Sequence, residues 1–154
     1  MPNWIEGTLK LRGQSEDLKR FFKEGVAQSE WFDDDKHSIE DYVQTDFDGA
    51  YCEVTLKNDP WIKGTRRAFI ESEYVTWNES FATIAVDVKQ AWHFDVDSFA
   101  EISKKFNLDI RLYGFECGME FCQEIEILKG KITINREITY GDWVWECPMP
   151  NMGG

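Results

Sequence analysis

Hydrophobic and polar residues alternate along much of the chain, which is the pattern of half-buried β-strands. The stretch from Trp4 to Arg12 is the first of these, with leucines and isoleucine on one face and polar residues on the other. A second clear case runs from Ile84 to Val88. The same period predicts further strands at residues 50–57, 68–77, 109–115, 119–128, 131–138 and 142–147.

Apolar residues three and four positions apart predict two helices. The first follows Ser15, which is a suitable N-cap, and ends at Gly25. Its apolar residues are Leu18, Phe21 and Phe22. The second helix carries Phe99, Ile102 and Phe106; it begins at Asp95 or Asp97 and ends at Asn107, since asparagine tolerates the left-handed conformation.

This order of elements predicts an α+β fold class. Two helices separated by strands indicate a ferredoxin-like split β-α-β arrangement, in which one antiparallel sheet has two helices on one face. The last strands add a C-terminal β extension, with a tight reversal at Lys129-Gly130. We expect a single domain over residues 1–147, with an insertion at about 28–49 covering the other face of the sheet, and a flexible tail at 148–154.

The predicted insertion combines acidic and aromatic residues. Residues 28–49 contain eight acidic residues and one lysine, a local charge of −7 out of −12 for the whole chain. An acidic run is most often a solvated face, but aromatic anchors within complementary charge also suit protein interfaces. The candidate partner-binding residues are Trp31, Phe32, Asp33, Asp34, Asp35, Asp41 and Tyr42.

The overall charge excludes some partners and favours others. A net charge of −12 disfavours direct contact with nucleic acid or with an anionic membrane, and it permits a basic protein partner. The N-terminal residues lack a signal-peptide pattern, and no apolar run approaches the length of a membrane helix. The four cysteines lie within strand-like text, so we expect reduced thiols in a cytoplasmic protein.

Motifs for catalysis or metal binding are weak. Cys117 and Cys122 are five positions apart, which places them on opposite faces of an extended strand, and no zinc-type pairing accompanies them. The sequence therefore predicts no metal site, no cofactor and no catalytic residues. One histidine, His93, lies beside Trp92 and near Asp95. These three are the candidates for a ligand pocket, although no nucleophile or glycine-rich loop accompanies them.

Several short motifs resemble a known family. The N-terminal Pro2-Asn3-Trp4 and Gly7–Gly13 resemble the signature of small proteins of phages and other mobile elements of Gram-positive bacteria. Residues 87–92, 112–116 and 118–121 are similar to the YubB-type ferredoxin-like domain. The chain departs from that pattern at residues 93–95 and at Gln123, where glycine is usual. The resemblance implies a fold and a mobile-element setting, and thus a bacterial host. It implies no activity and no catalytic residues.

We therefore take a non-enzymatic protein-binding module of phage or mobile-element origin as the leading hypothesis. Its acidic segment would contact the basic surface of a host protein and inhibit that protein. The host protein would act in defence or bind nucleic acid, which makes counter-defence a candidate role. The alternative is a small-molecule or nucleotide-binding protein, with a pocket near Trp92, His93 and Asp95. An enzyme is the third hypothesis and the least supported by the residues.

Overall fold

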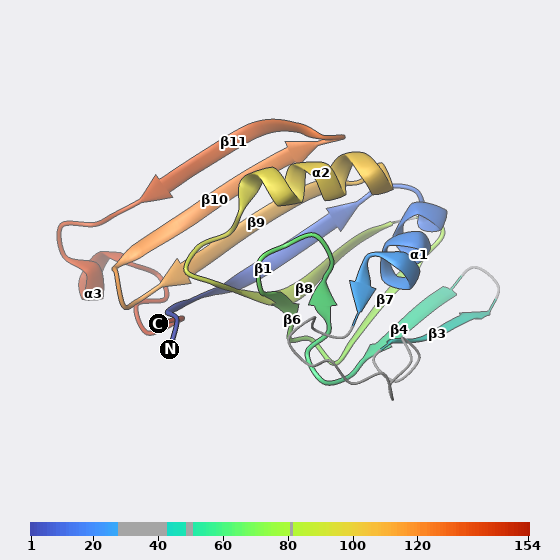
Figure 1. Ribbon diagram of the computed structural model, residues 1–154, viewed down its shortest axis with the longest axis horizontal. Coiled ribbons are helices and arrows are strands. Elements are labelled where there is room, and N and C mark those ends of the chain that lie inside the picture. Colours follow the sequence, from blue (N-terminus) through green and yellow to red (C-terminus); the bar gives the residue numbers. More distant parts are fainter. Residues whose placement is uncertain (28–42, 49–50, 81) are drawn as a thin grey trace.

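The computed structural model describes residues 1–27, 43–48, 51–80 and 82–154, and for 43–48 it describes the backbone alone. They form an eight-stranded antiparallel sheet, a second sheet of three strands and two principal helices (Figure 1). The strand order in the large sheet is β11 (Lys131–Ile138), β10 (Phe121–Leu128), β9 (Asp109–Glu116), β1 (Trp4–Arg12), β8 (Thr83–Ala91), β6 (Ala68–Ile70), β5 (Trp61–Ile62) and β2 (Val26–Ala27). The small sheet has the order β3 (Val43–Asp48), β4 (Tyr51–Leu56) and β7 (Tyr74–Asn78).

Strand β1 lies inside the large sheet, between β8 and β9. Its register places Leu9 between Val86 of β8 and Leu112 of β9. All three side chains are buried, because alternate residues of neighbouring strands share one face of a sheet. The N-terminal strand therefore joins the middle of the chain to its C-terminal half.

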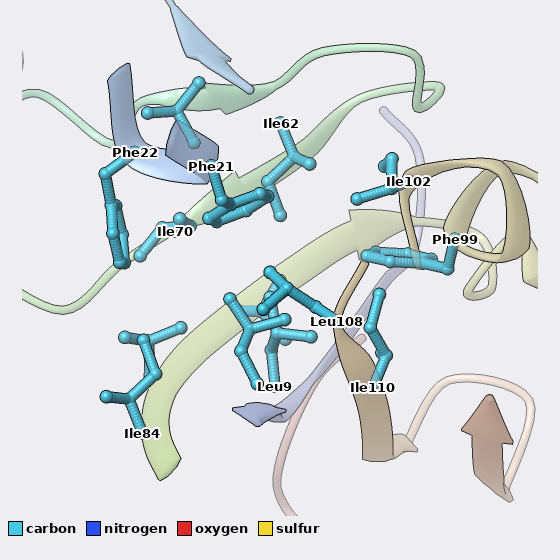
Figure 2. Packing of buried hydrophobic residues seen from close by; sticks show 14 of the residues in the cluster. Leu9, Phe21, Phe22, Ile62, Ile70, Ile84, Phe99, Ile102, Leu108 and Ile110 are labelled. Atoms are coloured by element: carbon cyan, nitrogen blue, oxygen red, sulfur yellow. The ribbon is translucent and has the colours of Figure 1, made fainter. Parts of the chain in front are cut away.

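The helices α1 (Ser15–Glu24) and α2 (Val96–Phe106) both lie on the apolar face of this sheet (Figure 1). Phe99, Ile102 and Phe106 of α2 are buried, as the sequence predicts. The rings of Phe21 on α1 and Phe106 on α2 meet edge to face, with 5.5 Å between centroids. The two helices thus share one hydrophobic core with the strands beneath them (Figure 2).

The three-stranded sheet packs against α1. Trp77 of β7 stacks on Phe22, with ring centroids 5.9 Å apart, and Cys52 of β4 is fully buried. The indole Nε1–H of Trp77 donates to the hydroxyl of Ser15 at 2.8 Å. Ser15 is therefore a buried hydrogen-bond acceptor and not the predicted N-cap, a position that Gln14 occupies.

The predicted fold class is wrong. The molecule is mostly a large antiparallel sheet with a second, smaller sheet and few helices, and not a ferredoxin-like α+β fold with two helices. One cause is the stretch at 68–77, which divides into β6 and β7 in different sheets. Alternation predicts that a segment is extended, but it does not say which neighbours the segment pairs with.

Several local predictions are confirmed. Asp95 is the N-cap of α2, and its carboxylate accepts from the backbone N–H of Ser98. Asn107 ends that helix in the left-handed region, with φ 54°. The reversal at Lys129-Gly130 joins β10 and β11, in which Leu128 pairs with Lys131.

The C-terminal segment differs from its prediction. Residues 142–147 do not form a strand; they contain the short helix α3 (Trp143–Glu146), and Asp142 caps it by accepting from Trp145 N–H. A small separate core, composed of Phe115, Cys122, Trp143 and Cys147, joins this segment to the sheet.

Residues 148–154, for which the sequence predicts a flexible tail, lie against the start of β1. The backbone N–H of Gly154 donates to the carbonyl of Trp4 at 2.8 Å. The indole Nε1–H of Trp143 donates to the carbonyl of Pro150 at 2.9 Å. The Cys117 thiol donates to the carbonyl of Gly153 at 2.9 Å. These bonds bring the two ends of the chain together at one end of the large sheet (Figure 1).

Candidate binding surfaces

The acidic candidate site is attached to both sheets. Its predicted residues Trp31, Phe32, Asp33, Asp34, Asp35, Asp41 and Tyr42 lie outside the described residues. The described chain on either side ends in β2, the last strand of the large sheet, and resumes in β3, an outer strand of the small sheet. Residues 28–42 therefore connect an edge of one sheet to an edge of the other, and the remainder of the predicted insertion contains β3 itself.

The second candidate site, Trp92, His93 and Asp95, lies in the connection between β8 and α2. Trp92 is 49% exposed and has φ 72°, and His93 is also exposed. The Asp95 carboxylate is committed to the helix cap: it accepts from the backbone N–H and the hydroxyl of Ser98. These three residues are neighbours in one turn, and their role as a ligand pocket stays a prediction.

Buried glutamines determine the shape of this turn. The side chain of Gln123 accepts from Phe94 N–H and donates to the Phe94 carbonyl, both at 2.9 Å. The side chain of Gln90 accepts from Asp95 N–H at 3.1 Å. A glutamine at position 123 therefore replaces a neighbouring strand as the hydrogen-bond partner of a buried backbone segment.

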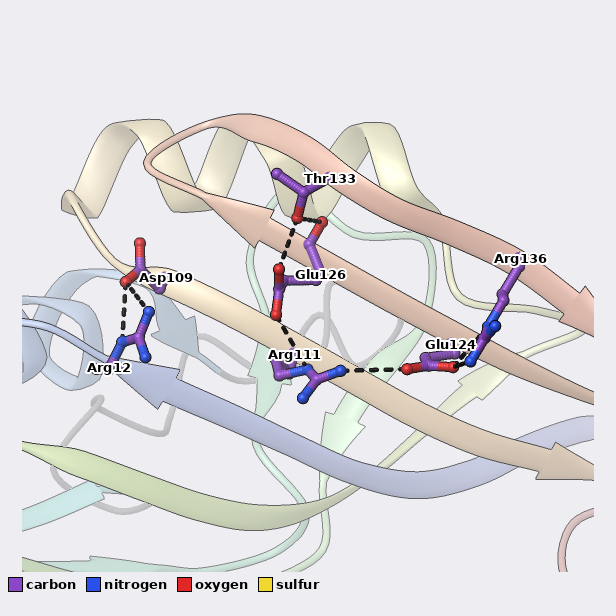
Figure 3. A network of polar contacts seen from close by, with 7 residues as sticks. All are labelled: Arg12, Asp109, Arg111, Glu124, Glu126, Thr133 and Arg136. Carbon is purple, nitrogen blue, oxygen red and sulfur yellow. Dashed lines mark hydrogen bonds and ion pairs between the residues drawn. The ribbon is translucent and has the colours of Figure 1, made fainter.

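A network of charged side chains covers the face of the large sheet opposite the helices (Figure 3). Arg12 binds Asp109 through Nε at 3.0 Å and Nη2 at 2.7 Å. Arg111 of β9 binds two carboxylates of β10, Glu124 at 3.1 Å and Glu126 at 3.3 Å. Glu124 also binds Arg136 of β11, with 2.7 Å between Oε2 and Nε. The network thus joins four neighbouring strands.

Within this network the cations are outermost. The arginine side chains keep 63%, 52% and 63% of their surface exposed, for Arg12, Arg111 and Arg136 respectively. The acidic partners are far less exposed, at 16% for Asp109, 13% for Glu124 and 25% for Glu126. The carboxylates therefore lie low against the sheet, and a partner that approached this face would meet guanidinium groups first.

Two shallow cavities lie in this face, with volumes of about 300 and 150 Å³. Lys10 and Arg111 line both cavities, and we call the two together the Lys10 groove. The groove also includes Thr8, Arg12, Tyr113, Glu124 and Glu126. Lys10 is exposed, and it makes no ion pair with any residue in the described part of the chain.

A third cavity, of about 440 Å³, lies on the helix side of the sheet. It is lined by the end of α1, the loop at Lys63-Gly64 and one face of α2. Its charged residues are Lys63, Asp97, Glu101 and Lys105, so the lining is of mixed sign. Neither Trp92 nor His93 lines any of these three cavities.

The thiols of Cys122 and Cys147 are part of the small hydrophobic core near the C-terminus. Burial, with the nearby Cys147 thiol, raises the pKa of Cys122 to about 12, and loss of solvation raises the pKa of Tyr140 to about 12. Both groups therefore stay protonated and weakly nucleophilic at neutral pH. Among the described residues, no three His, Cys, Asp or Glu side chains gather closely enough to hold a metal ion.

The sequence did not reveal the Lys10 groove, because its residues come from distant parts of the chain: Arg12 and Asp109 are 97 positions apart.

Helices long and apolar enough to cross a bilayer are absent from the described ranges. Comparison with family models, with curated proteins and with solved structures finds no match to this chain.

Proposed function

We propose that this protein is a non-enzymatic protein-binding module, and that the acidic aromatic segment at residues 28–49 contacts a basic surface on its partner. Through the resemblance described above, the proposal extends to an origin in a phage or mobile element and to inhibition of a bacterial host protein. Blocking of a defence or nucleic-acid-binding protein is the form of inhibition that the charge favours.

One observation carries this proposal. Residues 28–49 contribute −7 of the net charge of −12, and they also contain Trp31, Phe32 and Tyr42. Complementary charge accelerates encounter and fixes the orientation of a partner, while buried aromatic side chains supply most of the binding energy at protein interfaces. A flexible linker needs neither of these, because linkers are poor in aromatic residues.

The framework supports presentation of this segment. Strand β2 pairs with β5 through Val26 and Ile62, and both side chains are fully buried. Strand β3 pairs with β4 over six residues, from Val43 to Asp48. Residues 28–42 are therefore joined at one end to β2 and at the other to β3, a hydrogen-bonded strand within the segment itself. This attachment limits the entropy that binding would cost.

Charge neutralisation within the segment tests the proposal. We expect the variant Asp33→Asn, Asp34→Asn, Asp35→Asn and Asp41→Asn to lose at least about 90% of the partner that the native protein recovers from bacterial lysate. Removal of these four negative charges would slow association with a basic surface and weaken binding. The readout is quantitative mass spectrometry of the proteins captured on immobilised native or variant protein.

A matched control changes the same charge elsewhere. Substituting glutamine for Glu73, Glu101, Glu120 and Glu137, which are exposed and outside the ion pairs of the described residues, removes four negative charges outside the segment. This control should recover the partner as the native protein does. Equal recovery by the asparagine variant and the native protein would contradict the proposal, as would equal losses by both variants.

A further inference from the structure

The Lys10 groove contains two neighbouring positive charges, and their repulsion does not stabilise the fold. Lys10 of β1 lies directly opposite Arg111 of β9 in the strand register. Like charges directly opposite one another destabilise an antiparallel pair. Arg111 is compensated by Glu124 and Glu126, but Lys10 has no ion pair among the described residues. The groove therefore keeps one ammonium group that no described carboxylate neutralises.

The arginines beside Lys10 also keep open donors. Arg12 binds Asp109 through Nε and Nη2, and Arg111 binds its two carboxylates through Nη2 and Nε. In the contacts of the described residues, Nη1 of each guanidinium is unused. The carboxylates hold these guanidinium groups in fixed orientations, so less side-chain entropy is lost when a partner accepts their remaining hydrogen bonds.

We propose that the Lys10 groove is a docking surface for an acidic segment of a partner protein, with aspartate or glutamate carboxylates bound by Lys10, Arg12 and Arg111. A carboxylate accepts charge-assisted hydrogen bonds from both ammonium and guanidinium donors, which fits the groups that the groove presents. The most exposed charges of this surface are cationic, whereas the segment at 28–49 is acidic. The inference therefore goes beyond the proposed function and does not rest on it.

The surroundings of the groove favour a protein over a nucleic acid. Asp109, Glu124 and Glu126 lie directly beneath the cations, and the whole chain carries a net charge of −12. A polyanion would meet repulsion along its length, whereas single carboxylates spaced by neutral residues meet the cations locally. Among the described residues that line the two cavities, Tyr113 is the one aromatic side chain, which is too few for a base-stacking platform.

Fluorescence polarisation of the full chain tests this proposal, with a fluorescein-labelled peptide of alternating glutamate and alanine as the probe. We expect saturable binding that weakens as salt is raised. Lys10→Gln should reduce the affinity about tenfold, because it removes one charge-assisted contact, while Lys10→Arg should retain it. The control Lys131→Gln removes an exposed lysine at the start of β11 that lines neither cavity of the groove, and it should change the affinity less than about twofold.

Folding of each variant is checked by its circular dichroism spectrum and urea midpoint. The asparagine variant of the acidic segment should bind the glutamate peptide at least as well as the native chain, which separates this proposal from the proposed function. No saturable binding at about 1 mM peptide would overturn the inference, since such an affinity is too weak for a specific surface. Equal affinities for Lys10→Gln and Lys131→Gln, or tighter binding of oligothymidylate than of the peptide, would overturn it as well.

Discussion

Replacing Gly7 by alanine is expected to lower the free energy of unfolding by about 3 kcal/mol or more. Gly7 lies in the middle of β1, opposite Gly114 of β9. A Cβ at position 7 would lie 2.6 Å from the Cα of Gly114 and 2.8 Å from the carbonyl carbon of Tyr113, and closer still to the Tyr113 oxygen. These are backbone atoms, so relief of the overlap requires the two central strands to separate.

Urea unfolding followed by tryptophan fluorescence measures this effect by linear extrapolation. Gly141→Ala is the matched control: its nearest neighbour would be the Glu146 carboxylate oxygen at 3.8 Å, which is an ordinary contact. We expect the control to change the unfolding free energy by less than about 0.5 kcal/mol. If Gly7→Ala unfolded at the same urea concentration as the native chain, the pairing of β1 with β9 would be wrong.

Removing the ring of Phe106 should cost about 3 to 5 kcal/mol of stability, in the range of large-to-small substitutions in cores. Phe106 is 2% exposed and lies edge to face against Phe21, so it joins the two helices. The Arg20 guanidinium carbon lies 5.4 Å from the centre of its ring, and the Lys105 Nζ lies 5.2 Å from it. The substitution to alanine therefore removes packing and two cation–π contacts together.

Trp145→Ala is the comparison for Phe106→Ala, because it deletes a larger ring that is 86% exposed. The loss for Trp145→Ala should be below about 0.5 kcal/mol, as for most surface positions. Thermal and urea unfolding of both variants provide the measurement. A stability loss at Trp145 that equals the loss at Phe106 would contradict the assignment of α1 and α2 to one shared core.

Local patterns predicted the elements that depend on nearby residues alone. The apolar spacing of Phe99, Ile102 and Phe106 identified α2. Its start was predicted at Asp95 or Asp97, and the structure has Asp95 as the N-cap. Strand β1 and the β10–β11 hairpin follow from alternation and from a two-residue turn. Each of these signals acts within a few residues, so one sequence is sufficient to find it.

The errors concern long-range pairing and short apolar runs. Trp143 and Trp145 are two positions apart and would share one face of a strand, but in α3 the first is 5% exposed and the second 86%. The separation of 68–77 into two strands of different sheets depends on partners elsewhere in the chain. The local spacing of apolar residues cannot distinguish a strand from a short helix, or one sheet from another, because tertiary contacts decide both.

Of the two candidate binding surfaces, local sequence predicts one and cannot predict the other. The acidic segment is visible in the sequence, since charge and aromatic content are properties of composition. The Lys10 groove is not, because its cations and carboxylates meet through the register of β1, β9 and β10. An isolated Lys10 in an alternating strand is indistinguishable from any other solvent-facing residue. The register that places it opposite Arg111 is what makes it a candidate.

The account rests on one sheet that is built from both halves of the chain around β1, and residue-resolved amide hydrogen exchange tests that claim most directly. We predict that the hydrogen-bonded amides of β1, with those of β8 and β9, exchange slowest and only through global unfolding, and that the amides of the edge strand β11 exchange faster. If the amides of β1 exchanged as fast as those of β11, β1 would not be at the centre of the fold.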